Sequence, residues 1–402
     1  MKTGFLFSGQ GTQYPGMCRE LYEKEQTVKN CFEHASDILG YDVAALCFDE
    51  YGELNKTAAA QPAIFTVSAA MAKLFKEKTN FRPDFVAGNS VGEFAALATA
   101  NVLTFEDALK LVKVRAALMD AATAENCGVM YDVKDYSKEK LQEAIDSFKG
   151  NGIACISNIN GINNNIISGE AETVERIVEH ISKDGARTLR LNVSAGFHSP
   201  LMAEASRKFR LELEKYTFSE PECPVLSNVT GRPYSSAEEI SASLDKQIIS
   251  TVHWNDTMKF LEKNGCTEVI EFGPKRTLKN LALNNTSMAA YSYDDADDRK
   301  FVDGRYDINK MRAIIFGRLL RAAASTRNNN PDASNYRSAV IDNYREIERC
   351  YLRIADEKYI PSAKEIEECG KKLLEILSYK KVSGAERVCS ELVSEIKSKL
   401  LG

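Results

Sequence analysis

The sequence predicts an α/β fold followed by an all-helical extension, and three observations support this prediction. Strand-like apolar runs alternate with helical patterns over residues 1–295, which is typical of α/β proteins. From residue 300 onward the pattern becomes helical throughout. This last segment carries 20 Lys/Arg against 15 Asp/Glu, whereas the whole chain has a formal net charge of −5. The body and the extension therefore differ in both expected structure and charge.

The strand-like runs can be placed in order along the first part of the chain. They are Thr3–Ser8, Phe85–Ala87, Ile153–Ser157, Thr188–Val193 and Glu268–Phe272. Among the helices between them, the clearest is expected at about Phe105–Asp120, where apolar residues recur at helical spacing on one face. Thr104 and Asp107 form a capping-box pattern at its start.

A small α+β subdomain is expected inside this part of the chain, at about residues 126–194. Helical stretches over Ser137–Phe148 and Ala171–Asp184 lie there, flanked by two strand-like stretches. The segment is too short for half of a Rossmann fold with its cofactor loop.

The extension over residues 300–402 is expected to form about four helices. The loop Ser325–Asn335 separates the first two, and each of these has apolar residues along one face. Two further helices begin at capping boxes, Ser362 with Glu365 and Ser383 with Glu386.

The composition narrows the classes of protein to consider. A length of 402 residues predicts two or three compact units, and 44% apolar with 27% charged residues is typical of a soluble globular protein. The net charge gives no basis for nucleic-acid binding. No apolar stretch approaches the roughly 18–20 consecutive residues of a membrane span. We therefore expect neither nucleic acid nor a membrane as a partner.

The cysteines favour a reducing compartment. Ten of them are dispersed from Cys18 to Cys389 without a CxxC pair, so neither a zinc site nor a thioredoxin-like site is indicated. The apolar run Thr3–Ser8 is too short for the core of a signal peptide. Dispersed cysteines without a secretion signal favour reduced thiols and a cytoplasmic location.

A candidate nucleophile lies in Gly88-Asn89-Ser90-Val91-Gly92, a GxSxG sequence between a strand-like run and a helix-forming run. A serine at a sharp strand-to-helix turn projects from the sheet, and the helix N-terminus stabilises negative charge that develops beside it. The backbone N–H of Val91 would be one oxyanion donor. A glycine-rich turn with an N-capping serine is the alternative interpretation.

A candidate base must come from four histidines, His34, His180, His198 and His253. The first two lie in charged helical segments and are expected to be solvated. His198 follows a strand in a glycine-containing turn and lies C-terminal to the serine, the chain order of α/β-hydrolase-like sites. His253, beside the only tryptophan, is the second choice.

Arg115 is a charge in an unexpected place. Its helical spacing puts it on the apolar face of the helix at 105–120, which should pack inward. A buried guanidinium without a partner costs several kcal/mol. Two interpretations remain open: an ion pair with an internal carboxylate, or a grip on the free carboxylate of a substrate.

Together these segments resemble malonyl-CoA:acyl-carrier-protein transacylases and the acyltransferase domains of polyketide synthases, from residue 3 to about residue 290. The matching motifs are Phe7–Gln13 (GQGxQ), Gly88–Glu93 (GHSxGE), Arg115–Met119, Asn158–Asn160 with Ile166–Gly169, Ala195–Ser199 and Glu271–Pro274. Six matches in the same order are far more specific than any one of them.

The resemblance implies an [acyl-carrier-protein] S-malonyltransferase with a ping-pong mechanism. Ser90 would attack the thioester of malonyl-CoA, assisted by His198. The backbone N–H groups of Gln10 and Val91 would hold the oxyanion, and Arg115 would bind the malonyl carboxylate. The phosphopantetheine thiol of a holo acyl carrier protein would then accept the acyl group.

The resemblance also assigns supporting roles in the site. A backbone carbonyl at His253, rather than an acid, would orient the catalytic histidine. Met119 and Asn160 would bind substrate. Asn89 stands where the family usually has His and would line the acyl pocket, so it bears on acyl selectivity. Phe197 before His198 is the pattern associated, in polyketide relatives, with selection of malonyl over methylmalonyl groups.

The implied architecture is an acyltransferase domain over 1–295 with an α/β-hydrolase-like large subdomain and an inserted ferredoxin-like small one. No bound cofactor is implied, because coenzyme A enters as the thioester substrate. The helical module over 300–402 is a departure from the usual single-domain transacylases. Its excess of basic over acidic residues would suit binding of an acidic carrier protein. A packing or dimerising role is the alternative.

Two other functions compete with this interpretation. A GxSxG thioesterase or esterase would use the same serine, although simple esterases need neither Arg115 nor the GQGxQ segment. A non-catalytic docking protein would keep its function after Ser90→Ala. The sequence does not distinguish fatty acid synthesis from polyketide synthesis.

Overall fold

The computed structural model describes residues 2–49, 52–125, 128–150, 152–193, 195–356 and 359–401. The chain folds into two compact units, Met1–Glu77 with Arg82–Val302, and Lys78–Phe81 with Asp303–Gly402. The expected bounds of the small subdomain, residues 126 and 194, lie outside the described residues.

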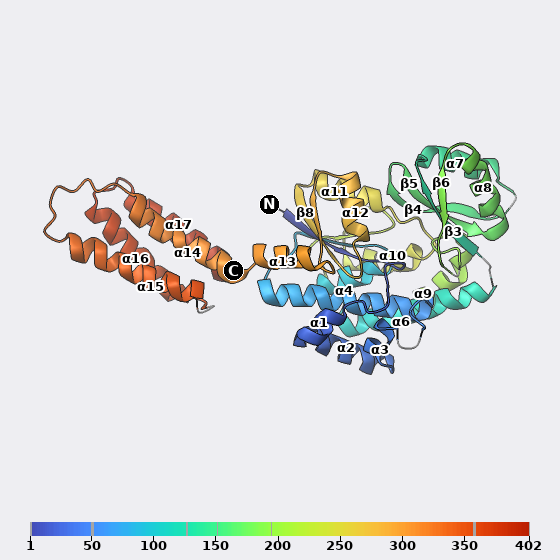
Figure 1. Ribbon diagram of the computed structural model, residues 1–402, viewed down its shortest axis with the longest axis horizontal. Helices are drawn as coiled ribbons and strands as arrows, with labels where there is room; N and C mark the ends of the chain where they lie inside the picture. The colour runs from blue at the N-terminus through green and yellow to red at the C-terminus, as the bar shows by residue number, and fades with distance from the viewer. Residues whose placement is uncertain are drawn as a thin grey trace. The chain divides into compact units, whose positions relative to one another are not determined.

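The first unit is built on a five-stranded parallel sheet (Figure 1). The strands are β1 (Lys2–Phe7), β2 (Phe85–Gly88), β7 (Val225–Leu226), β8 (Cys266–Phe272) and β9 (Ala289–Ser292), in the order β7-β2-β1-β8-β9. Nearly every residue of β1, β2 and β8 is buried, as expected for a parallel sheet covered on both faces.

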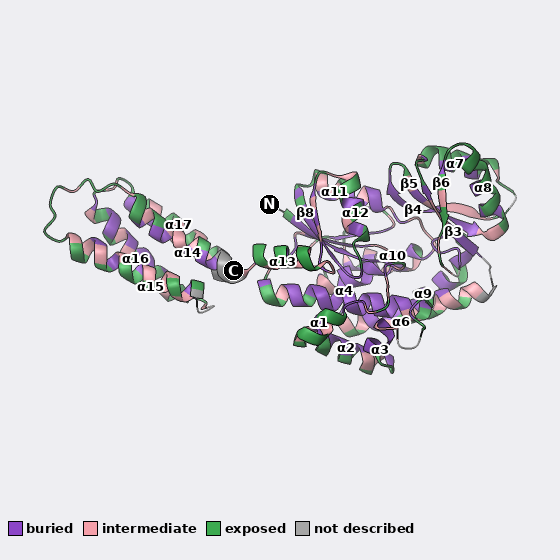
Figure 2. Ribbon diagram, viewed as in Figure 1, coloured by how far each residue is buried: buried purple, intermediate pink, exposed green. Residues whose placement is uncertain are grey.

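Alternation along β1 sends its side chains to two different cores. Phe5 contacts Phe75 of α4 (Thr57–Thr79), with ring centroids 5.7 Å apart. Leu6 points to the opposite face and joins a core with residues of α11 (Trp254–Lys263) and α12 (Thr277–Asn285). Figure 2 shows these inner faces as buried.

The other helices of this unit surround the sheet. They are α1 (Arg19–Lys24), α2 (Gln26–Leu39), α3 (Val43–Cys47), α5 (Gly92–Thr99), α6 (Phe105–Glu125), α9 (Ala203–Leu213), α10 (Ala237–Gln247) and the first seven residues of α13 (Ala296–Arg305), with a short 3₁₀ turn at Pro200–Met202. By length and composition α4 alone among the described helices could cross a membrane. Since 83% of its apolar window is buried inside the protein, it is a core helix.

The small subdomain has the element order β-α-β-β-α-β. It consists of β3 (Gly128–Lys134), α7 (Lys138–Ser147), β4 (Ala154–Gly161), β5 (Asn164–Glu170), α8 (Ala171–Lys183) and β6 (Arg187–Arg190). The strands form an antiparallel sheet in the order β4-β5-β3-β6. A bridge between Asn158 and Val252 ties β4 to the large subdomain. Both helices expected in this segment are present.

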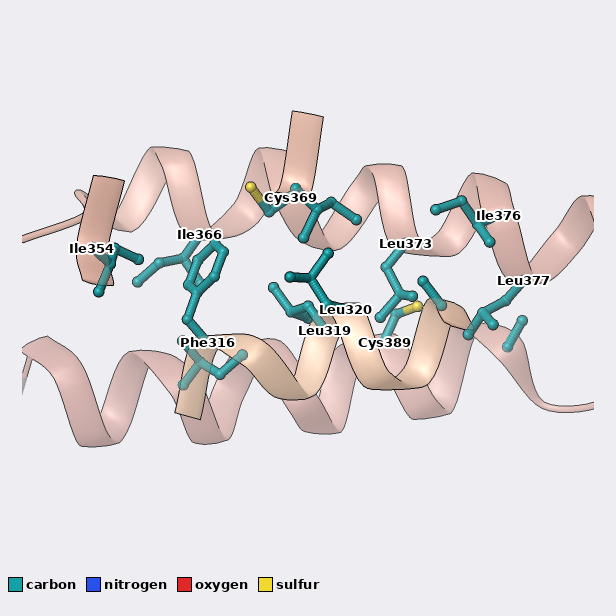
Figure 3. Close-up of a cluster of buried hydrophobic side chains, with 14 of the residues drawn as sticks. Phe316, Leu319, Leu320, Ile354, Ile366, Cys369, Leu373, Ile376, Leu377 and Cys389 are labelled. Carbon is teal, nitrogen blue, oxygen red and sulfur yellow. The ribbon is translucent and has the colours of Figure 1, made fainter. Parts of the chain in front are cut away.

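The second unit is helical, as the sequence predicts. Its elements are α14 (Ile308–Ser325), a π-helical stretch (Arg337–Asp342) leading into α15 (Asn343–Asp356), α16 (Ala363–Tyr379) and α17 (Ala385–Leu401). Phe316, Leu319, Ile366 and Leu373 are among the side chains that fill its own apolar core (Figure 3).

The helix starts in this unit agree in part with the capping patterns. The capping box of Ser362 and Glu365 is formed at the start of α16. The second predicted box does not coincide with the helix start, because α17 begins at Ala385, two residues after Ser383.

Candidate active site

Ser90 lies on a tight turn between β2 and α5. Its φ of 53° is left-handed, a conformation that costs energy for a residue with a side chain. A Cβ on Gly88 would come within 1.9 Å of the carbonyl carbon of Gly92, and one on Gly92 within 2.2 Å of the oxygen of Phe7. Both glycines are therefore required for the backbone to turn here, and the turn presents the serine at the carboxyl edge of the sheet.

The side chain of Asn228 fixes the backbone of this turn by two hydrogen bonds. Its Oδ1 accepts the backbone N–H of Ser90 at 2.6 Å, and its Nδ2 donates to the oxygen of Gly88 at 2.6 Å. Asn228 is not among the site residues that the sequence predicts. Its position just after β7, at the edge where the parallel strands end, is the signal that could have identified it.

His198 is in hydrogen-bonding contact with the serine. Its Nε2 lies 2.8 Å from Oγ of Ser90, and its Nδ1 lies 2.8 Å from the backbone oxygen of Gln247. Because a carbonyl only accepts, Nδ1 carries the proton, so Nε2 is free to accept from the serine hydroxyl. Burial, and then the positive charge of Arg115, lower the pKa of His198 to about 4, so the ring is neutral at neutral pH.

The orienting carbonyl belongs to Gln247, and the expectation of His253 in this role was wrong. The oxygen of His253 accepts from the N–H and hydroxyl of Thr257 in the first turn of α11. Gln247 is the last residue of α10. Carbonyls in a final helical turn lack an intrahelical partner, so this one can accept from an imidazole.

Arg115 reaches the same serine from α6. The residue is fully buried, and its Nη2 donates to Ser90 Oγ at 3.0 Å and to Oε1 of Gln247 at 2.9 Å. Its Nη1 donates to Oε1 of Gln61 at 2.5 Å. Among the described residues, no carboxylate forms an ion pair with it, and its Nε has no hydrogen-bond partner. Burial lowers its pKa to about 10, which still leaves it charged at neutral pH.

A buried carboxylate lies behind these groups. Glu93, at the start of α5, is fully buried and accepts from the hydroxyl of Tyr234, from Nε2 of Gln247 and from the N–H of Asn228. Burial raises the pKa of Glu93 to about 7, although these hydrogen bonds and Arg115 oppose the shift.

A cleft opens above Ser90 and receives residues from both subdomains. The expected site residues that line it are Gln10, Asn89, Ser90, Met119, Asn160, Phe197 and His198. Apolar side chains add to its walls, among them Met130, Ile166, Leu278 and Leu281. Of the predicted site residues, all line this one cleft except Val91, Arg115 and His253. Arg115 does not line the cleft, but it donates a hydrogen bond to Ser90, which does.

The segment that carries Gln10 packs directly on the serine turn. A Cβ on Gly9 would lie 2.6 Å from the backbone oxygen of Asn89, so only glycine allows this approach. Val91 is the residue before α5, and its backbone therefore belongs to the N-terminus of that helix. The loop after β1 and the N-terminus of α5 therefore both adjoin the turn that carries Ser90.

Comparisons with known proteins identify the family of this chain. Residues 4–296 match the family described as "Acyl transferase domain". A malonyl CoA-acyl carrier protein transacylase from Bacillus subtilis is 34% identical over 373 residues, which cover 90% of this chain and 92% of the relative. An alignment of this coverage extends into the helical unit, so at least part of the extension is shared with this relative.

Solved structures give the same result. The malonyl-transacylase in a complex with a type II PKS acyl-carrier protein (PlMCAT with AntF) is 34% identical, with a TM-score of 0.72 over 76% of this chain and 100% of that chain. The malonyl CoA-acyl carrier protein transacylase from Clostridium perfringens is 32% identical, with a TM-score of 0.73 over 78% and 99%. The chain belongs to the acyl transferase domain family and, within it, to the malonyl CoA-acyl carrier protein transacylases.

Proposed function

We propose that the protein moves a malonyl group from malonyl-CoA to the phosphopantetheine thiol of an acyl carrier protein, through an acyl-enzyme on Ser90, for fatty acid or polyketide synthesis. One observation carries the proposal. Arg115 is a buried guanidinium without an ion-pair partner among the described residues, and it donates to the same Oγ that contacts His198. A nucleophile beside an unpaired cation suits a thioester whose acyl group is itself an anion.

In the first half of the cycle, Ser90 Oγ attacks the thioester carbonyl while its proton passes to Nε2 of His198. The N–H groups of Gln10 and Val91 stabilise the negative oxygen that forms. The coenzyme A sulfur leaves and takes the proton from His198. Malonyl-Ser90 remains, with its free carboxylate held by Arg115.

In the second half, His198 takes the proton of the phosphopantetheine thiol, and the sulfur attacks the acyl-serine. Collapse of the second oxyanion returns the proton to Ser90 and releases malonyl-carrier protein. These steps use only side chains and backbone groups of this chain and the two substrates, one a thioester and the other a thiol, so the proposal includes no bound cofactor, nucleic acid or membrane.

The walls of the cleft would set which acyl group fits. Asn89 and Phe197 flank the two catalytic groups in sequence, and Met119 and Asn160 come from α6 and β4. Bulk at Phe197 would leave little room for a branch on the α-carbon, which favours malonyl over methylmalonyl.

We also propose the finer architecture and the location. The order β4-β5-β3-β6 with its two helices supports a ferredoxin-like subdomain, inserted in an α/β-hydrolase-like domain over 1–295, with the helical module at 300–402 appended to it. The nine described cysteines are free thiols, which supports a reducing, cytoplasmic location.

The proposal is tested by intact mass after mixing with a panel of acyl-CoAs. We expect a malonyl adduct on Ser90 that is absent in Ser90→Ala and that holo carrier protein removes faster than water does. Loss to water at the same rate with and without carrier protein would favour a thioesterase instead. No adduct on wild-type protein would contradict the acyl-enzyme.

A further inference from the structure

We propose that Glu93 is a positioning residue that fixes the orientation of the Gln247 side-chain amide and thereby aims Arg115 at the carboxylate of the substrate. This inference rests on the proposed function and adds to it a residue whose side chain bonds neither the substrate nor the nucleophilic hydroxyl. It comes from a buried set of hydrogen bonds that joins Glu93 to Ser90, His198 and Arg115 through a single residue, Gln247.

Gln247 is the centre of this set. Its Nε2 donates to Oε2 of Glu93 at 2.5 Å and to the backbone oxygen of Ser90 at 3.0 Å. Its Oε1 accepts from Nη2 of Arg115, and its backbone oxygen accepts from His198. One residue therefore contacts the nucleophile, the base and the guanidinium.

The orientation of the amide decides whether these contacts are favourable. An amide presents a donor on one side and an acceptor on the other. Arg115 only donates, so it requires the oxygen of Gln247, and an amide turned the other way would set an NH₂ group against a buried cation. In its ionised form Glu93 prevents this, because a carboxylate only accepts and so requires the NH₂ group on its own side.

Glu93 is itself held so that it cannot turn away. Its Oε1 accepts from the hydroxyl of Tyr234 and from the backbone N–H of Asn228, which leaves Oε2 for Gln247. The residue lies at the second position of α5, three residues after Ser90. The turn that presents the nucleophile therefore also supplies the anchor for the amide.

Glu93→Gln is the variant that tests this arrangement with the least change in shape. The backbone N–H of Asn228 cannot rotate, so the oxygen of the new side chain is expected to stay on that side. Its NH₂ group then faces Gln247 and requires the oxygen there, which forces the Gln247 amide to turn its NH₂ group towards Arg115. We expect Arg115 to lose its hold on an incoming carboxylate.

The quantity to measure is the ratio of kcat/KM for malonyl loading to kcat/KM for acetyl loading. Intact-mass spectrometry detects each adduct. For Glu93→Gln we expect this ratio to fall about tenfold or more, as for the loss of one hydrogen bond to a charged group. The matched control is Glu271→Gln. Glu271 is also fully buried and accepts from Ser8 and the N–H of Lys279, and among the described residues no hydrogen bond joins it to Gln247. Its replacement should lower stability and leave the ratio unchanged.

A second variant keeps the test decisive if Glu93→Gln does not fold. Gln247→Leu removes the amide and keeps the backbone carbonyl that contacts His198, and it should lower the ratio by a similar factor. Where both variants fold, the double variant should be no worse than the single ones, because both act through one amide.

Three outcomes separate the possibilities. An unchanged ratio in folded Glu93→Gln, or in Gln247→Leu, overturns the positioning role while wild-type loading upholds the proposed function. An equal fall in Glu271→Gln also overturns it, since the effect would then be one of stability. Absence of malonyl loading in the wild type overturns both.

Discussion

At the scale of single residues, the site depends on a hydroxyl whose two neighbours make opposite demands. Ser90 Oγ lies 2.8 Å from a nitrogen that must accept and 3.0 Å from a guanidinium nitrogen that must donate. The hydroxyl hydrogen is therefore directed to His198, while its lone pair faces Arg115. This arrangement prepares the proton transfer, and it leaves the guanidinium within reach of the group that the serine acquires.

The first prediction at this scale concerns Arg115→Ala. Malonyl loading should fall by about a hundredfold relative to acetyl loading, because only the malonyl group offers a carboxylate to a buried guanidinium. Intact-mass time courses with the two acyl-CoAs measure both rates. An equal loss for both substrates would contradict the role of Arg115 as a carboxylate clamp.

The second prediction concerns pH. His198 must be neutral to act as a base, and its lowered pKa keeps it neutral down to about pH 4. We therefore expect kcat/KM for acetyl loading to fall as the pH falls through about 4, rather than through the usual range near 6.5. Because Arg115 contributes to the shift, Arg115→Gln should move this limb to higher pH. If the acid side of the pH profile does not move in Arg115→Gln, the charge of Arg115 is excluded as a cause of the lowered pKa of His198.

How much of the site could be predicted differs from residue to residue. Ser90, His198 and Arg115 carry local signals, since each lies in a recognisable turn or on the wrong face of a helix. Gln247 carries none, and the only signal for Asn228 is its position after β7, a strand too short to be predicted; the two residues act across 157 and 138 residues of sequence. The misassigned orienting carbonyl at His253 has the same origin, since a backbone oxygen leaves no trace in the sequence.

At the scale of elements, β2, its turn and α5 form one unit that allows almost no change. The turn fits only because two positions have no side chain, and Asn228 then fixes the backbone between them. The element types were predictable from periodicity and capping, as the start of α6 shows, where the N–H of Asp107 donates to Thr104. The short strands β7 and β9 were not, because two to four residues give too little pattern.

The prediction at this scale is that Gly92→Ala lowers the free energy of unfolding by about 3 kcal/mol or more, because the new Cβ would overlap backbone atoms that cannot move aside. Urea unfolding followed by circular dichroism measures the change. The control is Gly304→Ala in α13, where a Cβ meets nothing within 4 Å and should be neutral or slightly stabilising. Similar effects at both positions would contradict the steric explanation.

At the scale of the whole molecule, the chain consists of two units with separate apolar cores. The sequence predicts both the α/β body and the helical extension, because their hydrophobic periods differ. It does not predict that Lys78–Phe81, at the end of α4, belongs with the second unit. That assignment depends on contacts such as that of Phe81 with Tyr306, which are distant in sequence.

The prediction at this scale is that damage to one core stays local. Leu373 is fully buried in the helical unit, and Leu373→Ala should lower the stability of that unit by about 2–5 kcal/mol. Malonyl loading of Ser90 should persist, because no group of the site belongs to that core. Calorimetry together with intact mass measures both properties. Loss of loading at a temperature where the first unit remains folded would show that the two units depend on each other.

The left-handed backbone at residue 90 recurs at His198, where φ is 55°. Two such conformations persist only while the surrounding structure imposes them, and here that structure is supplied by segments far along the chain. A chain whose first unit is partly unfolded would keep every motif in its sequence and still have no reactive pair. The chemistry of this protein is thus a property of the completed tertiary structure of its first unit, so activity appears only once that unit has folded.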